Sequence, residues 1–131
     1  MTSSSLANNE AAAVFLLDDD PSVLKATGRL LSSAGWEVET FTDPYSFLEH
    51  AQRHLPPVVV IDIWMPLMNG FEVQARLRSV SPSTQVIVLT SKDDPSVRTR
   101  AMAAGAFAFF LKEANDDALL ASVASAVRKN H

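Results

Sequence analysis

The sequence has no cysteine among its 131 residues, which excludes disulfides and thiolate zinc sites and leaves the redox compartment unmarked. A basic stripe is also missing. The formal net charge is −4, so we expect no direct nucleic-acid binding by this segment. No apolar run approaches the roughly 20 residues of a membrane helix. A signal peptide has basic residues ahead of its apolar run, and residues 1–10 contain none. These absences predict a cytoplasmic protein without membrane contact.

The length and composition indicate one globular domain. At 131 residues the chain has room for a single core, and 47% hydrophobic residues are ample to fill it. Residues 1–10 are small and polar, which predicts a disordered tail, because such residues bury too little apolar surface to offset their ordering entropy. The folded domain is therefore expected over residues 11–131.

Short apolar runs alternate with helical patterns along this domain. Pro follows Asp at three helix starts, and glycine follows two helix ends. The runs predicted to be strands cover residues 13–17, 36–41, 58–61, 85–89 and 107–111. This alternation predicts an α/β fold, a flavodoxin-like doubly wound parallel sheet of five strands with five helices. By the rules of that fold, the expected strand order is 2-1-3-4-5.

Acidic residues stand where two of the predicted strands end. Asp18 and Asp19 follow the first strand, and Asp62 follows the continuous β-branched run 58–61, which is typical of a strand buried on both faces. In the expected order these two strands are neighbours, and their carboxyl ends flank the point where ligands bind. Three converging carboxylates repel one another unless a hard divalent cation binds them. The pattern predicts a magnesium site suited to phosphate chemistry.

Several further landmarks follow the predicted strands in order. The full set is Asp18-Asp19, Asp62 followed by Met65-Pro66 and Asn69-Gly70, Thr90-Ser91, and Lys112. Each motif is weak alone. Taken in order over about residues 14–129, they resemble the landmarks of the receiver domain of two-component response regulators.

The resemblance implies a role for each of these positions. Asp62 would accept a phosphoryl group from a sensor histidine kinase, with Lys112 and Thr90 contacting the phosphoryl oxygens. Mg²⁺ or Mn²⁺ would be held by Asp19 directly, Asp18 through water, Asp62 and the backbone carbonyl of Trp64. No organic cofactor is implied. The domain would be a regulatory phosphoacceptor rather than an enzyme, limited to self-catalysed phosphotransfer and slow autodephosphorylation.

The same resemblance implies a conformational switch. Thr90 would move toward the phosphoryl group, and Phe109, three positions before Lys112, would turn inward. The output or homodimer surface would then be the face of the helix after Asp94, strand 107–111 and the last helix. Phe107, Phe109 and Met102 are expected to give this face apolar content.

One position departs from the family pattern. Glu113 follows Lys112 where the family usually has proline after a cis bond, so either a trans or a strained link is expected here. The run Lys112-Glu113-Ala114 is similar to receivers of regulators with helix-turn-helix output domains. The segment is therefore expected to be the N-terminal part of a DNA-binding transcriptional regulator, or else to act alone.

Simpler interpretations compete with these roles. The acidic triplet after residue 17 could cap a helix, and for Asp20 capping is the better explanation. A pseudo-receiver that only mediates protein contacts is one alternative function. A doubly wound enzyme or nucleotide-binding module is weaker, because no glycine-rich phosphate loop follows the first strand and no second acid lies two residues past Asp62. His50, His54 and His131 are expected to be solvated and non-catalytic, and Trp64 is expected to slow attack by water on a phosphorylated Asp62.

Overall fold

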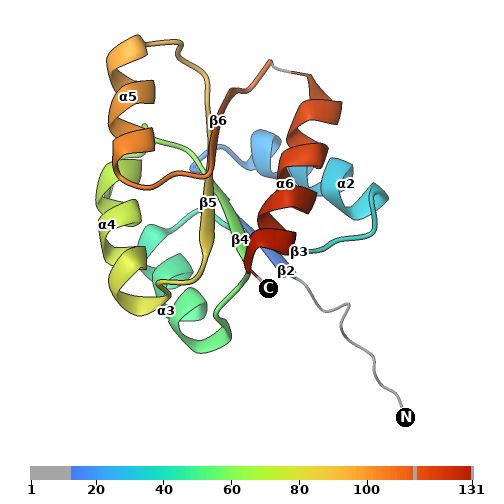
Figure 1. Ribbon diagram of the computed structural model, residues 1–131, viewed down its shortest axis with the longest axis horizontal. Coiled ribbons are helices and arrows are strands. Elements are labelled where there is room, and N and C mark those ends of the chain that lie inside the picture. Colours follow the sequence, from blue (N-terminus) through green and yellow to red (C-terminus); the bar gives the residue numbers. More distant parts are fainter. Residues whose placement is uncertain (1–12, 114, 131) are drawn as a thin grey trace.

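The computed structural model describes residues 13–113 and 115–130 as a parallel sheet with helices on both faces (Figure 1). The sheet has five strands in the order β3-β2-β4-β5-β6, which is 2-1-3-4-5 along the chain and confirms the predicted topology. The strands are β2 (Ala13–Leu17), β3 (Glu37–Phe41), β4 (Val58–Ile61), β5 (Gln85–Thr90) and β6 (Ala108–Leu111). The predicted disordered tail, residues 1–10, lies outside the described residues.

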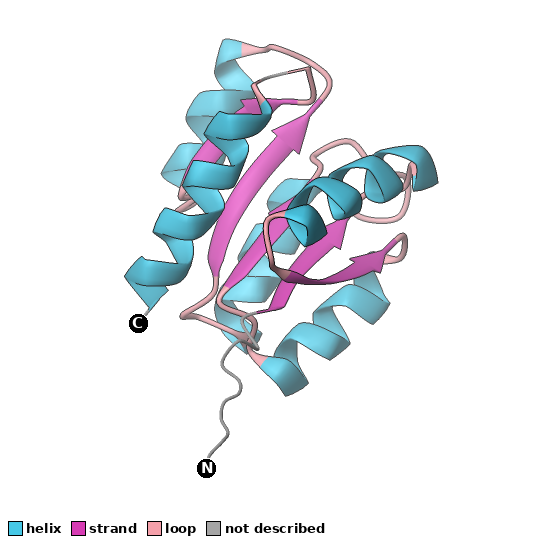
Figure 2. Ribbon diagram, turned by 90° about the vertical axis from the view of Figure 1, so that its right-hand side faces the viewer, coloured by secondary structure: helices cyan, strands magenta, loops and turns pink. Residues whose placement is uncertain are grey.

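Five helices form the two outer layers (Figure 2). They are α2 (Pro21–Ser33), α3 (Pro44–His54), α4 (Gly70–Val80), α5 (Pro95–Ala103) and α6 (Asp116–Asn130). The buried residues of α3, α4 and α5 share one core cluster, and those of α2 and α6 share the other, so each group covers one face of the sheet. Among the described residues, no helix combines the length and the apolar character that crossing a bilayer requires.

Side-chain caps explain why the helices begin where they do. The carboxylates of Asp20, Asp43 and Asp94 each accept a hydrogen bond from the backbone N–H two residues later, and proline follows each of them. Asn69 and Glu72 form a reciprocal capping box at the start of α4. This box starts the helix at Gly70, and the helix continues to Val80.

The central strand β4 is buried along its whole length, as its uninterrupted β-branched run predicts. It pairs with β2 on one side, where Leu17 lies opposite Ile61, and with β5 on the other. Two buried strands therefore end side by side, immediately before Asp18 and Asp62.

Two sequence-based expectations need correction: the apolar content of the outer face and the solvation of His50. Phe109 is only 5% exposed and packs in the core with α5, so it adds no apolar surface to the outer face; Phe107 is half-buried against the opposite core cluster. Met102 is exposed, as expected. His50 is not fully solvated, because its ring lies 5.1 Å from that of Phe41 and its Nδ1 is 2.9 Å from the carbonyl oxygen of Ser46.

Among the described residues, every peptide bond is trans, including the Lys112–Glu113 link, which is one of the two forms expected there.

Candidate functional site

The sheet itself brings Asp18 and Asp62 together. Beyond the paired strands, the N–H of Asp18 donates to the carbonyl of Phe41 at 3.1 Å, and the N–H of Asp62 donates to the carbonyl of Leu17 at 3.0 Å. These bonds extend the ladder by one residue past each strand end. Both carboxylates are thus held on rigid backbone at the carboxyl edge of the sheet.

Asp19 joins these two residues in an acidic cluster. One carboxylate oxygen from each of Asp18, Asp19 and Asp62 lies within 4.8 Å of the other two. Asp18 and Asp62 are 4% and 5% exposed, whereas Asp19 is exposed. An all-oxygen donor set with one open side fits Mg²⁺, which binds few carboxylates and keeps several waters. The three carboxylates predicted to hold the metal therefore do converge.

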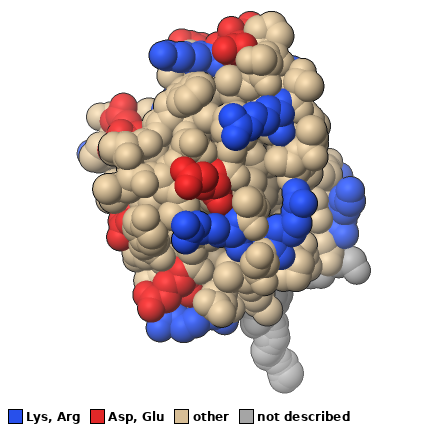
Figure 3. All heavy atoms as spheres, turned by 90° about the vertical axis from the view of Figure 1, so that its left-hand side faces the viewer, with Lys and Arg blue, Asp and Glu red and all other residues tan. Residues whose placement is uncertain are grey.

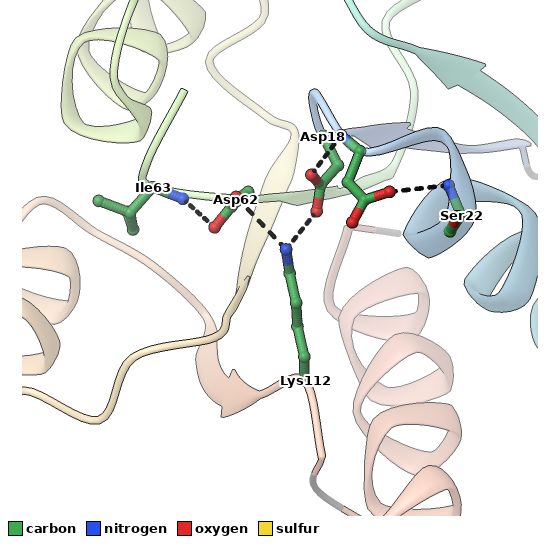
Figure 4. Close-up of polar contacts among 6 residues, drawn as sticks. Asp18, Ser22, Asp62, Ile63 and Lys112 are labelled. Atoms are coloured by element: carbon green, nitrogen blue, oxygen red, sulfur yellow. Dashed lines mark hydrogen bonds and ion pairs between the residues drawn. The ribbon is translucent and has the colours of Figure 1, made fainter. Parts of the chain in front are cut away.

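Lys112 enters the cluster from the far edge of the sheet (Figure 4). Its Nζ lies 2.8 Å from Oδ2 of Asp18 and 3.4 Å from Oδ2 of Asp62. The backbone N–H of Lys112 donates to the carbonyl of Thr90 at 2.8 Å, which fixes where its side chain departs from the sheet. Three carboxylates and one ammonium leave the site with a formal charge of −2, which favours a divalent cation.

Burial and neighbouring charge shift two pKa values in the site. Burial raises the pKa of the Asp18 carboxyl, and the nearby charge of Asp62 raises it further, against the hydrogen bonds from Lys112 and the Asp20 N–H. For Lys112, burial alone lowers the pKa, but the hydrogen bond to Asp18 and the charges of Asp62 and Asp18 outweigh it and raise the pKa. Asp18 therefore keeps its proton to higher pH than a free aspartate does, and Lys112 keeps its proton to higher pH than a free lysine does.

The orientation of Asp62 depends on two neighbours that the sequence patterns did not single out for this role. The N–H of Ile63 donates to Oδ1 of Asp62 at 2.8 Å, leaving Oδ2 on the side of Lys112. Gly70 packs against this segment so closely that a Cβ built on it would lie 2.5 Å from the carbonyl oxygen of Asp62. The Asn-Gly pair marks a turn in the sequence, but its proximity to Asp62 is a tertiary contact.

Thr90 is the last residue of β5 and is fully buried. Its Oγ1 makes no hydrogen bond with any described protein group, which is unusual for a buried hydroxyl. Phe109 lies two residues before the partner of Thr90 on β6, and the guanidinium carbon of Arg98 lies 4.7 Å from its ring centroid. The buried hydroxyl of Thr90 therefore has no protein partner among the described residues. It lies at the end of β5, which pairs with β4, the strand that Asp62 follows.

The other predicted residues lie on the loops around the cluster. Trp64 follows Asp62 by two residues, and its side chain is 45% exposed. Asp20 caps α2, with its Oδ1 accepting a hydrogen bond from the N–H of Ser22 at 2.9 Å, which confirms its assignment as a cap. His54 is exposed on α3, and His131 lies outside the described residues.

Comparison with known proteins agrees with this geometry. Residues 14–124 match the family described as the response regulator receiver domain. The chain is 31% identical over 121 residues to the response regulator protein TodT of Pseudomonas putida, covering 92% of this chain and 53% of that protein. It is 35% identical over 117 residues to the transcriptional regulatory protein KdpE of Mycobacterium tuberculosis, covering 89% of this chain and 51% of that protein.

A solved structure gives the same result. The signal receiver domain of the putative response regulator NarL from Mycobacterium tuberculosis superposes with a TM-score of 0.80 at 30% identity, covering 89% of this chain and 96% of that one. The chain spans about half the length of the curated relatives it matches. It therefore belongs to the receiver domain family of two-component response regulators.

Proposed function

We propose that this receiver domain is a magnesium-dependent phosphoacceptor whose acceptor is Asp62. The observation that carries the proposal is the convergence of Asp18, Asp19, Asp62 and Lys112 at one edge of the sheet. Oδ2 of Asp62 faces the lysine, while Oδ1 is tied to the Ile63 N–H. Oδ2 has the position expected of a nucleophile, because the bond at Oδ1 orients the carboxylate and the Lys112 ammonium lies beside Oδ2.

The reaction is a transfer between two residues. An oxygen of the Asp62 carboxylate attacks the phosphorus of a phosphohistidine on a sensor kinase, a P–O bond forms as the P–N bond breaks, and the imidazole leaves with the electron pair. Asp19, Asp62, the Trp64 carbonyl and, through water, Asp18 would hold Mg²⁺, which when bound would neutralise charge on the phosphoryl oxygens. Lys112 contributes a second positive charge beside Oδ2 of Asp62.

The phosphorylated state is sensed through Thr90. Its buried, unpaired hydroxyl can donate to a phosphoryl oxygen on Asp62, which would satisfy a group that has no protein partner among the described residues. Movement of Thr90 toward Asp62 changes the space beside Phe109, and the change reaches the surface of α5, β6 and α6. We assign this surface to output or homodimer formation.

The wider context is also part of the proposal. The matched part of this chain covers 53% of TodT and 51% of KdpE, and KdpE is named a transcriptional regulatory protein. We infer that the domain regulates a DNA-binding output module, with no nucleic-acid contact of its own. A stand-alone receiver would carry the same phosphorylation chemistry.

Phosphorylation by acetyl phosphate, read by intact mass, tests the proposal. We expect one phosphoryl group per chain in the presence of Mg²⁺ and none after chelation. Asp62→Asn should abolish the adduct and Asp19→Asn should reduce it, whereas Asp117→Asn, which changes an exposed carboxylate on α6, should leave it intact. A magnesium-independent adduct, or one retained by Asp62→Asn, would refute the proposal. No adduct on the folded wild-type protein would favour a phosphorylation-independent pseudo-receiver.

A further inference from the structure

The groove between α4 and α5 is bridged by polar and cationic side chains, beside the apolar core to which both helices contribute. Only Val97 and Ala101 of α5 are buried. Across the groove, the amide Nε2 of Gln74 donates to the carbonyl of Ala101 at 3.1 Å, and Arg78 donates to the carbonyl of Ala104. From the other side, the guanidinium carbon of Arg100 lies 3.9 Å from the ring centroid of Phe71. We call these residues the α4/α5 groove: Phe71, Gln74, Arg78, Arg100, Ala101 and Ala104.

The two arginines of this groove lack acidic partners within the described residues. Over residues 13–113 and 115–130, the only ion pairs are those of Lys112 with Asp18 and Asp62. Arg78 and Arg100 are both exposed, and basic side chains extend across the middle of the face on which α4 and α5 lie, beside an acidic patch (Figure 3). These basic side chains gather on a chain whose formal net charge is −4.

Both guanidinium groups are already oriented. Stacking on Phe71 leaves the in-plane N–H donors of Arg100 available, and Arg78 uses one nitrogen for the Ala104 carbonyl and keeps its remaining donors. Guanidinium donors match carboxylates in a planar, two-point geometry. Phe71 and Arg78 are seven residues apart on α4, so the two cationic ends of the groove are separated by roughly 10 Å along the helix.

A polar cavity lies at the Arg78 end of the groove. It has a volume of about 80 Å³, several times the roughly 10–15 Å³ that one water needs, and it is lined in part by Gln74, Arg78, Ser81 and Thr84. Gln74 is 3% exposed, and its Oε1 accepts no hydrogen bond from any described protein group. The site therefore offers cationic donors together with one buried acceptor that lacks a donor.

We propose that the α4/α5 groove binds an extended acidic segment of a protein partner. Carboxylates about three residues apart in an extended chain are separated by roughly 10 Å, which matches the spacing of Arg100 and Arg78. One acidic side chain would enter the cavity beside Arg78. Duplex DNA fits less well, because the net negative charge of the chain repels it.

A labelled peptide tests the groove directly. The probe is a fluorescein-labelled peptide of about eight residues rich in Asp and Glu, compared with its Asn/Gln counterpart by fluorescence anisotropy at moderate salt. We expect saturable binding of the acidic peptide only. Arg78→Met and Arg100→Met, which keep the alkyl stem, should each weaken binding by about five- to tenfold. Arg29→Met, on α2 at the opposite face of the sheet, is the matched control and should not.

Further arms separate this proposal from the phosphoacceptor function and from misfolding. Asp62→Asn should bind the peptide as the wild type does, so loss of phosphorylation does not count against the groove. Arg100→Lys keeps the positive charge but loses the planar guanidinium, so its affinity for the acidic peptide should lie between those of the wild type and Arg100→Met. The proposal would be overturned if Arg29→Met weakened binding equally, if the neutral peptide bound with equal affinity, or if no binding occurred up to about 1 mM peptide. It would also be overturned if duplex DNA bound more tightly than the peptide, or if the protein formed a dimer that the Arg78 and Arg100 variants abolished.

Discussion

Lys112 and Asp18 form a close ion pair, Nζ to Oδ2 at 2.8 Å, although their strands β6 and β2 are separated in the sheet by β4 and β5. The lysine reaches over the ends of the two intervening strands to meet the acid. It supplies part of the positive charge that the three carboxylates require. A divalent cation and the lysine ammonium therefore act on the same acidic groups.

Removing this charge should strengthen metal binding. We expect Lys112→Met to bind Mg²⁺ about three- to tenfold more tightly than the wild type, because a repelling charge near the site is lost. Trp64 lies two residues from Asp62, so its fluorescence reports the titration, in a Trp36→Phe background that removes the other tryptophan. The same variant should accept phosphate more slowly. Unchanged or weaker Mg²⁺ affinity would show that Lys112 does not oppose the cation.

The raised pKa of Asp18 predicts the sign of a pH effect on stability. The folded state holds this proton more tightly than the unfolded chain, whose carboxyl titrates at about 3.9, so its contribution to stability falls as pH rises from that value through the folded pKa. Asp18→Asn should therefore gain stability relative to the metal-free wild type over that window and keep the gain above it. Urea unfolding from about pH 4 to pH 8 measures the difference. If Asp117→Asn gained as much stability, the effect could not be assigned to the buried Asp18 carboxyl.

The raised pKa of Lys112 acts at the other end of the pH scale. The contribution of Lys112 to folding stability is fully present below about pH 10.4, the pKa of lysine in the unfolded chain, and is lost as pH rises through the pKa in the folded state. In Lys112→Met the loss of stability above about pH 10 should be smaller than in the wild type. Identical alkaline limbs in the two proteins would show that other groups govern this transition.

Thr90→Val should uncouple stability from signalling. Because Oγ1 of Thr90 is buried without a protein partner, a methyl group of the same shape should leave the free energy of unfolding unchanged or raise it by up to about 1 kcal/mol. The phosphorylation-dependent change in hydrogen exchange should be lost. Thr84→Val is the matched control. Oγ1 of Thr84 is bonded to Ser81 and to the Pro56 carbonyl, so its loss should cost about 1–3 kcal/mol. Comparable destabilisation by both changes would contradict an unpaired Thr90 hydroxyl.

Gly70→Ala should damage the phosphoacceptor loop. The added Cβ would lie 2.5 Å from the Asp62 carbonyl oxygen and 2.8 Å from Cα of Ile63, both backbone atoms that cannot move alone. We expect a loss of about 1–3 kcal/mol and slower phosphorylation. Gly28→Ala on α2 meets only ordinary contacts at 3.8–3.9 Å and should instead stabilise by up to about 1 kcal/mol. Thermal unfolding of the two variants gives the comparison, and equal effects would rule out the close contact.

Trp64→Ser should shorten the lifetime of the phosphorylated state. The half-exposed indole follows Asp62 by two residues, and we expect it to restrict the approach of water to an acyl phosphate there. The decay of the phosphorylated mass after removal of acetyl phosphate measures the effect, with Trp36→Phe as a tryptophan change away from the site. A lifetime equal to that of the wild type would remove this role for Trp64.

Local patterns were enough to predict the elements and most of their limits. Asp followed by Pro marked the starts of α2, α3 and α5, because the carboxylate caps and the ring pre-sets the first helical turn. The buried run 58–61 predicted a central strand. The strand order, and with it the meeting of Asp18 with Asp62, followed from a rule of the fold. The sequence alone shows only alternating strands and helices.

What required the tertiary structure were contacts between segments far apart in the chain. Lys112 could be proposed as a site residue only by resemblance, and its pairing with Asp18 depends on side-chain reach across two strands. The inward packing of Phe109, the close approach of Gly70 to Asp62, and the bonds of Gln74 and Arg78 to α5 also leave no periodic mark in the sequence. Periodicity reports which side of an element is buried, whereas these contacts depend on which element packs against that side, and only the folded chain decides this.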